Sequence, residues 1–179
     1  MSGNALEFFA NAIAKDWGPL STKVVTAIRG HMEMLLQAPQ TESWLEDLKR
    51  NAPPSQELVR DAQFGFVLQA HTEAQGLYRP PHDHGRSWVI YAVQAGEVEM
   101  CTYGRIIAAD GSVRLVKRDS VIVQPGQVRV YLPGDIHDTQ CVAGPALLYR
   151  FTERDLKIED RVERRITRYA ERNGAWVAP

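Results

Sequence analysis

From residue 57 onward, the chain is a succession of short segments rich in β-branched and aromatic residues, separated by turn signals. Pro125-Gly126 and Pro133-Gly134 are two of these signals, and residues 128–132 alternate apolar and polar side chains as a half-buried strand does. Short strands at close, even spacing predict a sandwich or a barrel. The expected strands are 64–68, 88–93, 98–107, 113–116, 121–123, 128–131 and 146–151.

Helical periodicity precedes these strands. Two stripes of apolar residues recur at helical spacing, one from Leu6 to Trp17 and one from Val24 to Leu36. Ser43 and Glu46 have the spacing of a capping box, which predicts a third, short helix. Stripes of this kind usually face inward, so we expect the helices to pack against the strands that follow.

A final helix is expected at the carboxyl end. Val162, Ile166 and Tyr169 recur at i, i+4 and i+7, and Asn173-Gly174 follows as a C-cap. The sequence thus predicts one mainly β domain with helices at both ends. Its expected parts are a single domain 1–179 with a helical segment 1–52, a barrel 57–152 and a C-terminal helix 158–173.

Composition argues against several classes of protein. The 21 Lys and Arg residues balance 22 Asp and Glu residues, a net charge of −1 that disfavours a nucleic-acid partner. No apolar run reaches the roughly 18 residues of a membrane span, so no membrane partner is expected. The first residues lack the basic region of a signal peptide, so a cytoplasmic location is expected. Two cysteines are too few for a disulfide framework.

The histidines carry the main functional signal. His82 and His84 form an H-x-H pair, and residues i and i+2 of a strand project to one face. The Pro133-Gly134 turn would deliver His137 from a later strand. Three neutral imidazoles suit iron, zinc, copper or nickel and leave coordination positions open. We expect packing or surface exposure for His31 and assign no role to His71.

These motifs resemble those of the cupin superfamily and, within it, of the thiol dioxygenases. The cupin pattern is an H-x-H pair followed by a Glu and a Gly, then a P-x-G-x-x-H motif. His82, His84 and Gly96 match its first part, and 133–137 approximates the second. The cupin Glu would fall near Val89, which cannot bind a metal, as in the three-histidine cysteine dioxygenase group. The resemblance spans about Val24 to Leu156 and implies a cupin double-stranded β-helix, the RmlC-like jelly-roll barrel.

Two features of the cysteine dioxygenases are missing. Their Cys–Tyr crosslink would join positions that align here with Val89 and Phe151, so the crosslink cannot form. Their S-x-H-x-Y set aligns with Leu147, Tyr149 and Phe151, of which only Tyr149 can donate a hydrogen bond. The Arg that binds the carboxylate of cysteine would fall near Gln56, an arrangement closer to the 3-mercaptopropionate dioxygenases.

Those relatives take their carboxylate-binding Arg from after the last barrel strand. Arg161 is the nearest candidate here, followed by Arg164. The arginines expected near the site are Arg86, Arg129, Arg150 and Arg161. A guanidinium binds a carboxylate through two charge-assisted hydrogen bonds.

The resemblance implies a cysteine dioxygenase-like enzyme that uses O2 to oxidise a small thiol carboxylate to its sulfinate. Fe(II) is the expected metal, with Zn, Ni or Mn as alternatives, and a homodimer is expected by analogy. No catalytic residue is expected beyond the metal ligands. The candidate site residues are the metal ligands His82, His84 and His137 and the substrate-binding residues Arg161, Gln56, Tyr149, Trp88 and Arg86. Another cupin reaction, such as isomerisation or a different oxygenation, and a non-catalytic small-molecule-binding cupin stay as alternatives.

Overall fold

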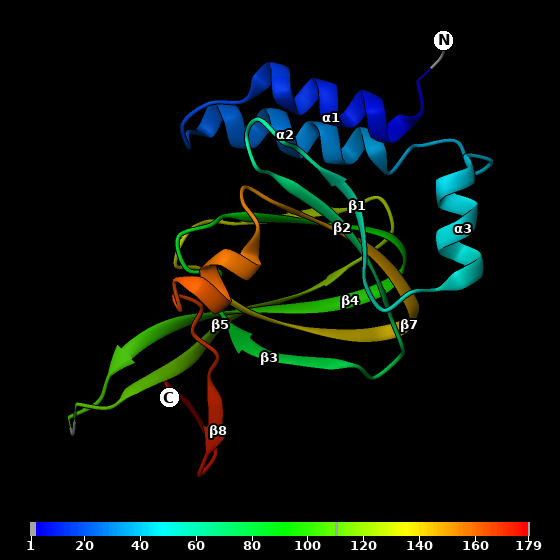
Figure 1. The fold of residues 1–179 in the computed structure, drawn as a ribbon. Coiled ribbons are helices and arrows are strands. Elements are labelled where there is room, and N and C mark those ends of the chain that lie inside the picture. The colour runs from blue at the N-terminus through cyan, green and yellow to red at the C-terminus, as the bar shows by residue number, and fades with distance from the viewer. Residues whose placement is uncertain (1–2, 110, 179) are drawn as a thin grey trace.

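The computed structural model describes residues 3–109 and 111–178. Three helices come first and lie on one side of a curled sheet (Figure 1). They are α1 (Ala5–Asp16), α2 (Thr22–Leu35) and α3 (Ser43–Asn51). The apolar stripes predicted from the sequence are the buried faces of α1 and α2. Among the described residues, no helix has both the length and the apolar character needed to cross a membrane.

Nine strands of the described chain form one antiparallel sheet. They are β1 (Gln56–Arg60), β2 (Val67–Glu73), β3 (Tyr78–His82), β4 (Val89–Ile107), β5 (Val113–Val123), β6 (Val128–Tyr131), β7 (Ile136–Thr152), β8 (Ala170–Arg172) and β9 (Ala175–Val177). The order is β1-β2-β7-β4-β5-β9-β8, while β3 pairs with β7 and β6 pairs with β4. The predicted mainly β fold, a curled sheet preceded by helices, is confirmed.

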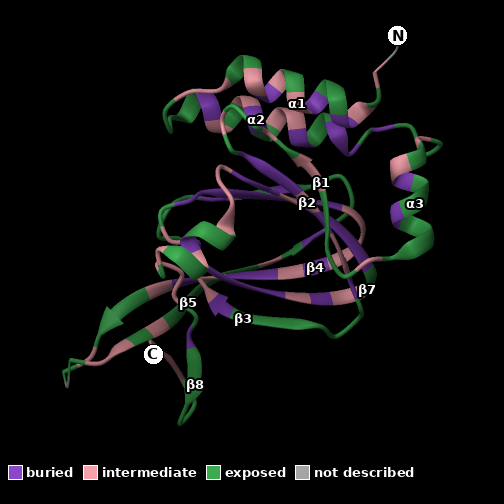
Figure 2. Ribbon diagram, viewed as in Figure 1, coloured by how far each residue is buried: buried purple, intermediate pink, exposed green. Residues whose placement is uncertain are grey.

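The two faces of this sheet bury different clusters. Ile90 and Ala92 of β4 face the helices, together with Tyr149 and Phe151 of β7. The alternate residues of the same strands, such as Val89, line a second cluster inside the curled sheet. Figure 2 shows buried residues along the central strands and on α1 and α2. The helices therefore cover the outer face and leave the interior of the barrel to the site.

Strand lengths differ from those predicted. Segments 88–93 and 98–107 are one strand, β4, and Gly96 lies inside it, where β4 and β7 change register. Gly96 has φ +74, and a Cβ there would lie 2.6 Å from the carbonyl oxygen of Ala143. This close approach of two backbones needs glycine at an irregularity in the ladder. The sequence pattern had predicted two separate strands, 88–93 and 98–107, on either side of this position.

The expected helix over 158–173 is not formed. The segment begins with a short π-helical turn, η1 (Ile158–Val162), and ends in the hairpin of β8 and β9. Asn173 and Gly174 both have positive φ, so they form the hairpin turn and not a helix C-cap. The fully buried Glu159 of this segment accepts a hydrogen bond of 3.2 Å from the backbone N–H of Arg86, and it also forms an ion pair of 2.7 Å with Arg154. Tertiary contacts of this kind override the local helical pattern.

The start of α3 also differs from the prediction. Its N-cap is Glu42, so the Ser43–Glu46 capping box does not form. The Glu42 carboxylate instead accepts two hydrogen bonds of 3.0 Å from the backbone N–H of Ala5, at the start of α1. It also accepts a bond from Trp44 Nε1. One carboxylate thus ties two helices together.

Candidate metal centre

Three histidines meet inside the barrel. His82 is the last residue of β3, His84 lies two residues further in the connection to β4, and His137 is the second residue of β7. The Pro133-Gly134 turn, with φ +85 at Gly134, leads into β7 as predicted. The H-x-H pair is therefore not on one continuous strand, but one ligand atom from each of the three histidines lies within 4.8 Å of the others.

The ring nitrogens fit a metal. His82 donates from Nδ1 to the carbonyl oxygen of Pro80 at 2.8 Å, which leaves its Nε2 lone pair available. Both ring nitrogens of His137 and Nδ1 of His84 are buried and have no hydrogen-bond partner within the described chain. An unpaired buried polar atom is costly, and coordination would satisfy it. Tyr131 stacks on His137 with ring centroids 3.9 Å apart, which fixes the orientation of the imidazole.

Burial keeps these imidazoles neutral. It lowers the pKa of His82, and it lowers the pKa of His84 and His137 well below the usual imidazole value. The proximity of the rings to one another adds to the effect at His84 and His137, because a charge on one disfavours a charge on the next. Neutral imidazole is the metal-binding form of histidine.

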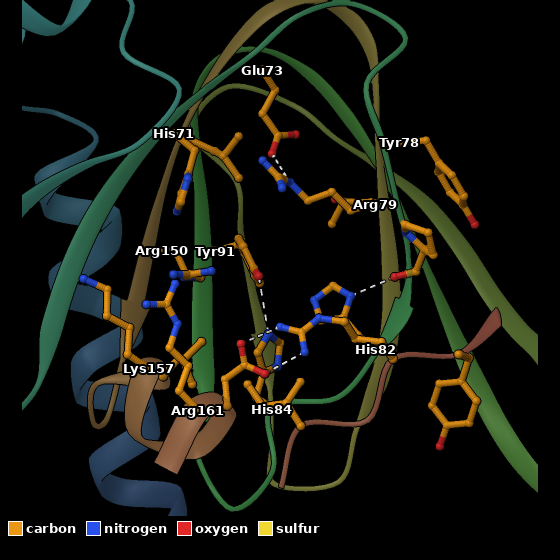
Figure 3. A pocket seen from close by; sticks show the side chains of 18 residues that line it. His71, Glu73, Tyr78, Arg79, His82, His84, Tyr91, Arg150, Lys157 and Arg161 are labelled. Carbon is orange, nitrogen blue, oxygen red and sulfur yellow. Dashed lines mark hydrogen bonds and ion pairs between the residues drawn. The ribbon is translucent and has the colours of Figure 1, made fainter. Parts of the chain in front are cut away.

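His82 and His84 line one side of a pocket of about 510 Å³ (Figure 3), and His137 packs against both of them. Residues from β2, β3, β4, β7 and the segment after β7 line it. The sequence reasoning assigned no role to His71 and Tyr91, which both line this pocket. The hydroxyl of Tyr91 lies 3.5 Å from Nε2 of His84. Burial and the charge of Arg150 lower the pKa of His71 to about 3.

Of the substrate-binding candidates, Arg161 lines the pocket. Trp88 and Tyr149 are buried in the cluster beneath the helices, and Gln56 and Arg86 are exposed outside the pocket. Arg150, which the sequence pointed to only as an arginine near the site, lies among the pocket residues. Strict alternation along β7 from His137 would have placed Tyr149, and not Arg150, on the inner face.

Val89 and Phe151, the positions aligned with the Cys–Tyr crosslink, belong to different clusters. Val89 faces the interior of the barrel, whereas Phe151 packs beneath the helices against Trp17 and Trp88. The two side chains thus lie on opposite faces of the sheet. Neither cysteine substitutes for them, since Cys101 and Cys141 are both buried and free.

Comparison with known proteins finds similarity in structure alone. No protein-family model matches the chain, and no curated protein matches its sequence. Solved structures similar to it include KdgF from a Halomonas species, with 17% identity over 55% of this chain and 74% of that one, at a TM-score of 0.43. The cupin domain of Schizosaccharomyces pombe Cnp3 shares 13% identity over 61% of this chain and 69% of that one, also at a TM-score of 0.43. A cupin superfamily protein from Desulfitobacterium hafniense shares 15% identity over 56% of this chain and 76% of that one, again at a TM-score of 0.43.

Proposed function

We propose that this chain is a metal-dependent cupin oxygenase of the thiol dioxygenase type, which oxidises a small thiol carboxylate to its sulfinate. One observation supports the proposal: three imidazoles, two of them buried, converge beside a pocket whose two lining carboxylates are both engaged elsewhere. Glu73 pairs with Arg79 and Asp160 pairs with Arg168. The ligand set would therefore be His82, His84 and His137, without the carboxylate of ordinary cupins.

Such a centre suits Fe(II), which would supply the redox chemistry of the balanced reaction RS⁻ + O2 → RSO2⁻. The chain's own residues bind and orient the substrate. Arg150 and Arg161 line the pocket and are the candidates that hold the substrate carboxylate. The apolar side chains inside the barrel exclude water from the buried side of the site. The choice of a thiol rests on the resemblance of the histidine motifs to those of the thiol dioxygenases.

The test combines metal content with oxygen uptake. Protein loaded anaerobically with Fe(II) should consume one O2 per thiol acid, and ¹⁸O2 should place both labelled atoms in the sulfinate. His84→Ala should lose both iron and oxygen uptake. His31→Ala is the matched control, because His31 is a half-buried residue of α2 that hydrogen-bonds Asp16 of α1 and does not line the pocket. Stoichiometric iron without oxygen uptake on any thiol acid would refute the dioxygenase proposal.

A further inference from the structure

The pocket carries more positive than negative side chains. Its cations are Arg79, Arg150, Lys157, Arg161 and Arg168, and its anions are Glu73 and Asp160. Both anions are neutralised, Glu73 by Arg79 at 2.7 Å and Asp160 by two contacts of 2.6 and 2.9 Å from Arg168. Within the described chain, Arg150, Lys157 and Arg161 have no carboxylate at ion-pair distance. The side chains that line the pocket therefore carry three more positive than negative charges before any metal is bound.

Arg150 is the inner of these charges. It lies on β7, next to Tyr91 of β4 in the ladder, and its Nη2 donates to the side-chain oxygen of Gln69. Its Nε is buried without a hydrogen-bond partner. Arg150 lines the same pocket as His82 and His84. A buried guanidinium N–H without an acceptor can be satisfied by an anion that arrives with the ligand.

Lys157 and Arg161 are the outer charges. They lie four residues apart in the segment after β7, and both are exposed at the rim of the pocket (Figure 3). Asp160, between them in sequence, is occupied by Arg168. Positive charges that line one cleft attract anions more strongly than the same charges spread over a surface, because the low-dielectric walls focus their field.

We propose that the substrate carries two anionic groups, one bound by Arg150 beside the histidines and one bound by Lys157 and Arg161 at the rim. A volume of about 510 Å³ exceeds the needs of a three-carbon thiol acid and leaves room for the second group. The inference deepens the proposed function, on which it rests for the thiol group. The substrate class is then a thiol dicarboxylate.

The first experiment measures binding without turnover. Calorimetric titration of the metal-loaded protein, under nitrogen and at low ionic strength, compares succinate with butyrate, which has the same number of carbons and one carboxylate. One charge-assisted contact corresponds to an affinity gain of about tenfold or more, so succinate should bind at least about tenfold more tightly than butyrate. Equal affinities would overturn the inference.

Variants assign the outer carboxylate. The double variant Lys157→Gln/Arg161→Gln should weaken succinate binding more than butyrate binding, so that the two ligands bind this variant with similar affinity. Arg118→Gln/Arg172→Gln removes the same charge from exposed positions outside the pocket, so it should keep the preference for succinate. A double variant at the rim that retains the full preference would overturn the assignment.

The second experiment separates this inference from the proposed function. Mercaptosuccinate is 3-mercaptopropionate with a second carboxylate, and it should show at least about a tenfold higher kcat/KM for oxygen uptake. If succinate is preferred but neither thiol is oxidised, the dianion site stands and the dioxygenase function fails. If both thiols are oxidised equally well and succinate binds no better than butyrate, the function stands and the dianion site fails.

Discussion

Asp83 lies between two of the candidate ligands and ties their loop to the carboxyl-terminal segment. Its Oδ1 accepts hydrogen bonds from the backbone N–H of Gly85 at 3.0 Å and of Thr167 at 2.9 Å. Its own N–H donates to the carbonyl oxygen of Thr167 at 3.1 Å, and the residue is 8% exposed. Asp83→Ala would leave two backbone N–H groups without an acceptor. We expect this variant to loosen the loop that carries His82 and His84.

The magnitude follows from those two bonds. Loss of an acceptor costs about 1–3 kcal/mol for each buried donor, and water can partly satisfy donors that are only part-buried. We therefore expect Asp83→Ala to lower the free energy of unfolding of the metal-free protein by about 3 kcal/mol. Partners that orient metal ligands typically contribute 10- to 100-fold to metal affinity, so the variant should also bind its metal about that much more weakly.

Urea unfolding of the metal-free protein measures the first effect. With a slope of about 2 kcal/mol per molar urea, a loss of about 3 kcal/mol lowers the midpoint by about 1.5 M. Competition with a chelator measures the second effect. Asp83→Asn is the matched control, because the amide keeps an acceptor oxygen and should lose less than half as much stability. An Asp83→Ala protein with the midpoint of the parent would refute the reasoning. Lowered stability with unchanged metal affinity would show that the loop does not position the ligands.

Two further predictions concern His71 and the crosslink positions. The folded-state pKa of His71, about 3, lies below the unfolded value of 6.5, so the unfolded chain takes up the proton first as the pH drops. The free energy of unfolding therefore falls between pH 6.5 and 3, by at most about 1.4 kcal/mol per pH unit. Urea unfolding at several pH values between 6 and 4.5 measures this effect. The free energy of unfolding of metal-free His71→Gln should fall less with decreasing pH than that of the parent, and an equal fall would contradict the assignment. Because Val89 and Phe151 replace the Cys and Tyr of the cysteine dioxygenases, intact mass spectrometry of aerobically purified protein should give the unmodified mass; a loss of two hydrogens mapped to a Cys–Tyr pair would contradict this.

The parts of the fold that depend on local periodicity could be predicted from the sequence. The stripe that includes Phe9 and Ile13 and the stripe that includes Ile28 and Met32 are buried faces of helices. In both, local propensity and burial favour the same structure. The turn before His137 was equally readable, because Pro-Gly specifies a tight turn by its own backbone preferences.

The carboxyl-terminal segment could not be predicted in this way, because contacts distant in sequence determine its path. Asp83 exchanges hydrogen bonds with Thr167, and Tyr169 donates its N–H to the carbonyl oxygen of Pro81. The charged residues of this segment form ion pairs such as Asp160–Arg168. A usable signal was present in Asn173-Gly174, because Asn-Gly is the preferred two-residue turn of a β-hairpin.

Tyr149 and Arg150 show why two-residue alternation does not reliably predict which side chains of a long strand face the site. His137 and Cys141 point into the barrel, so a strict period of two would place Tyr149 inside as well. The register between β4 and β7 shifts around Ala95 and Glu97, and after that irregularity the inward positions on β7 are the even-numbered ones. A one-residue slip exchanges the two faces of a strand. It therefore puts the Tyr149 phenol under the helices and the Arg150 guanidinium into the pocket, which is why the pocket presents a cation where the alignment had placed a phenol.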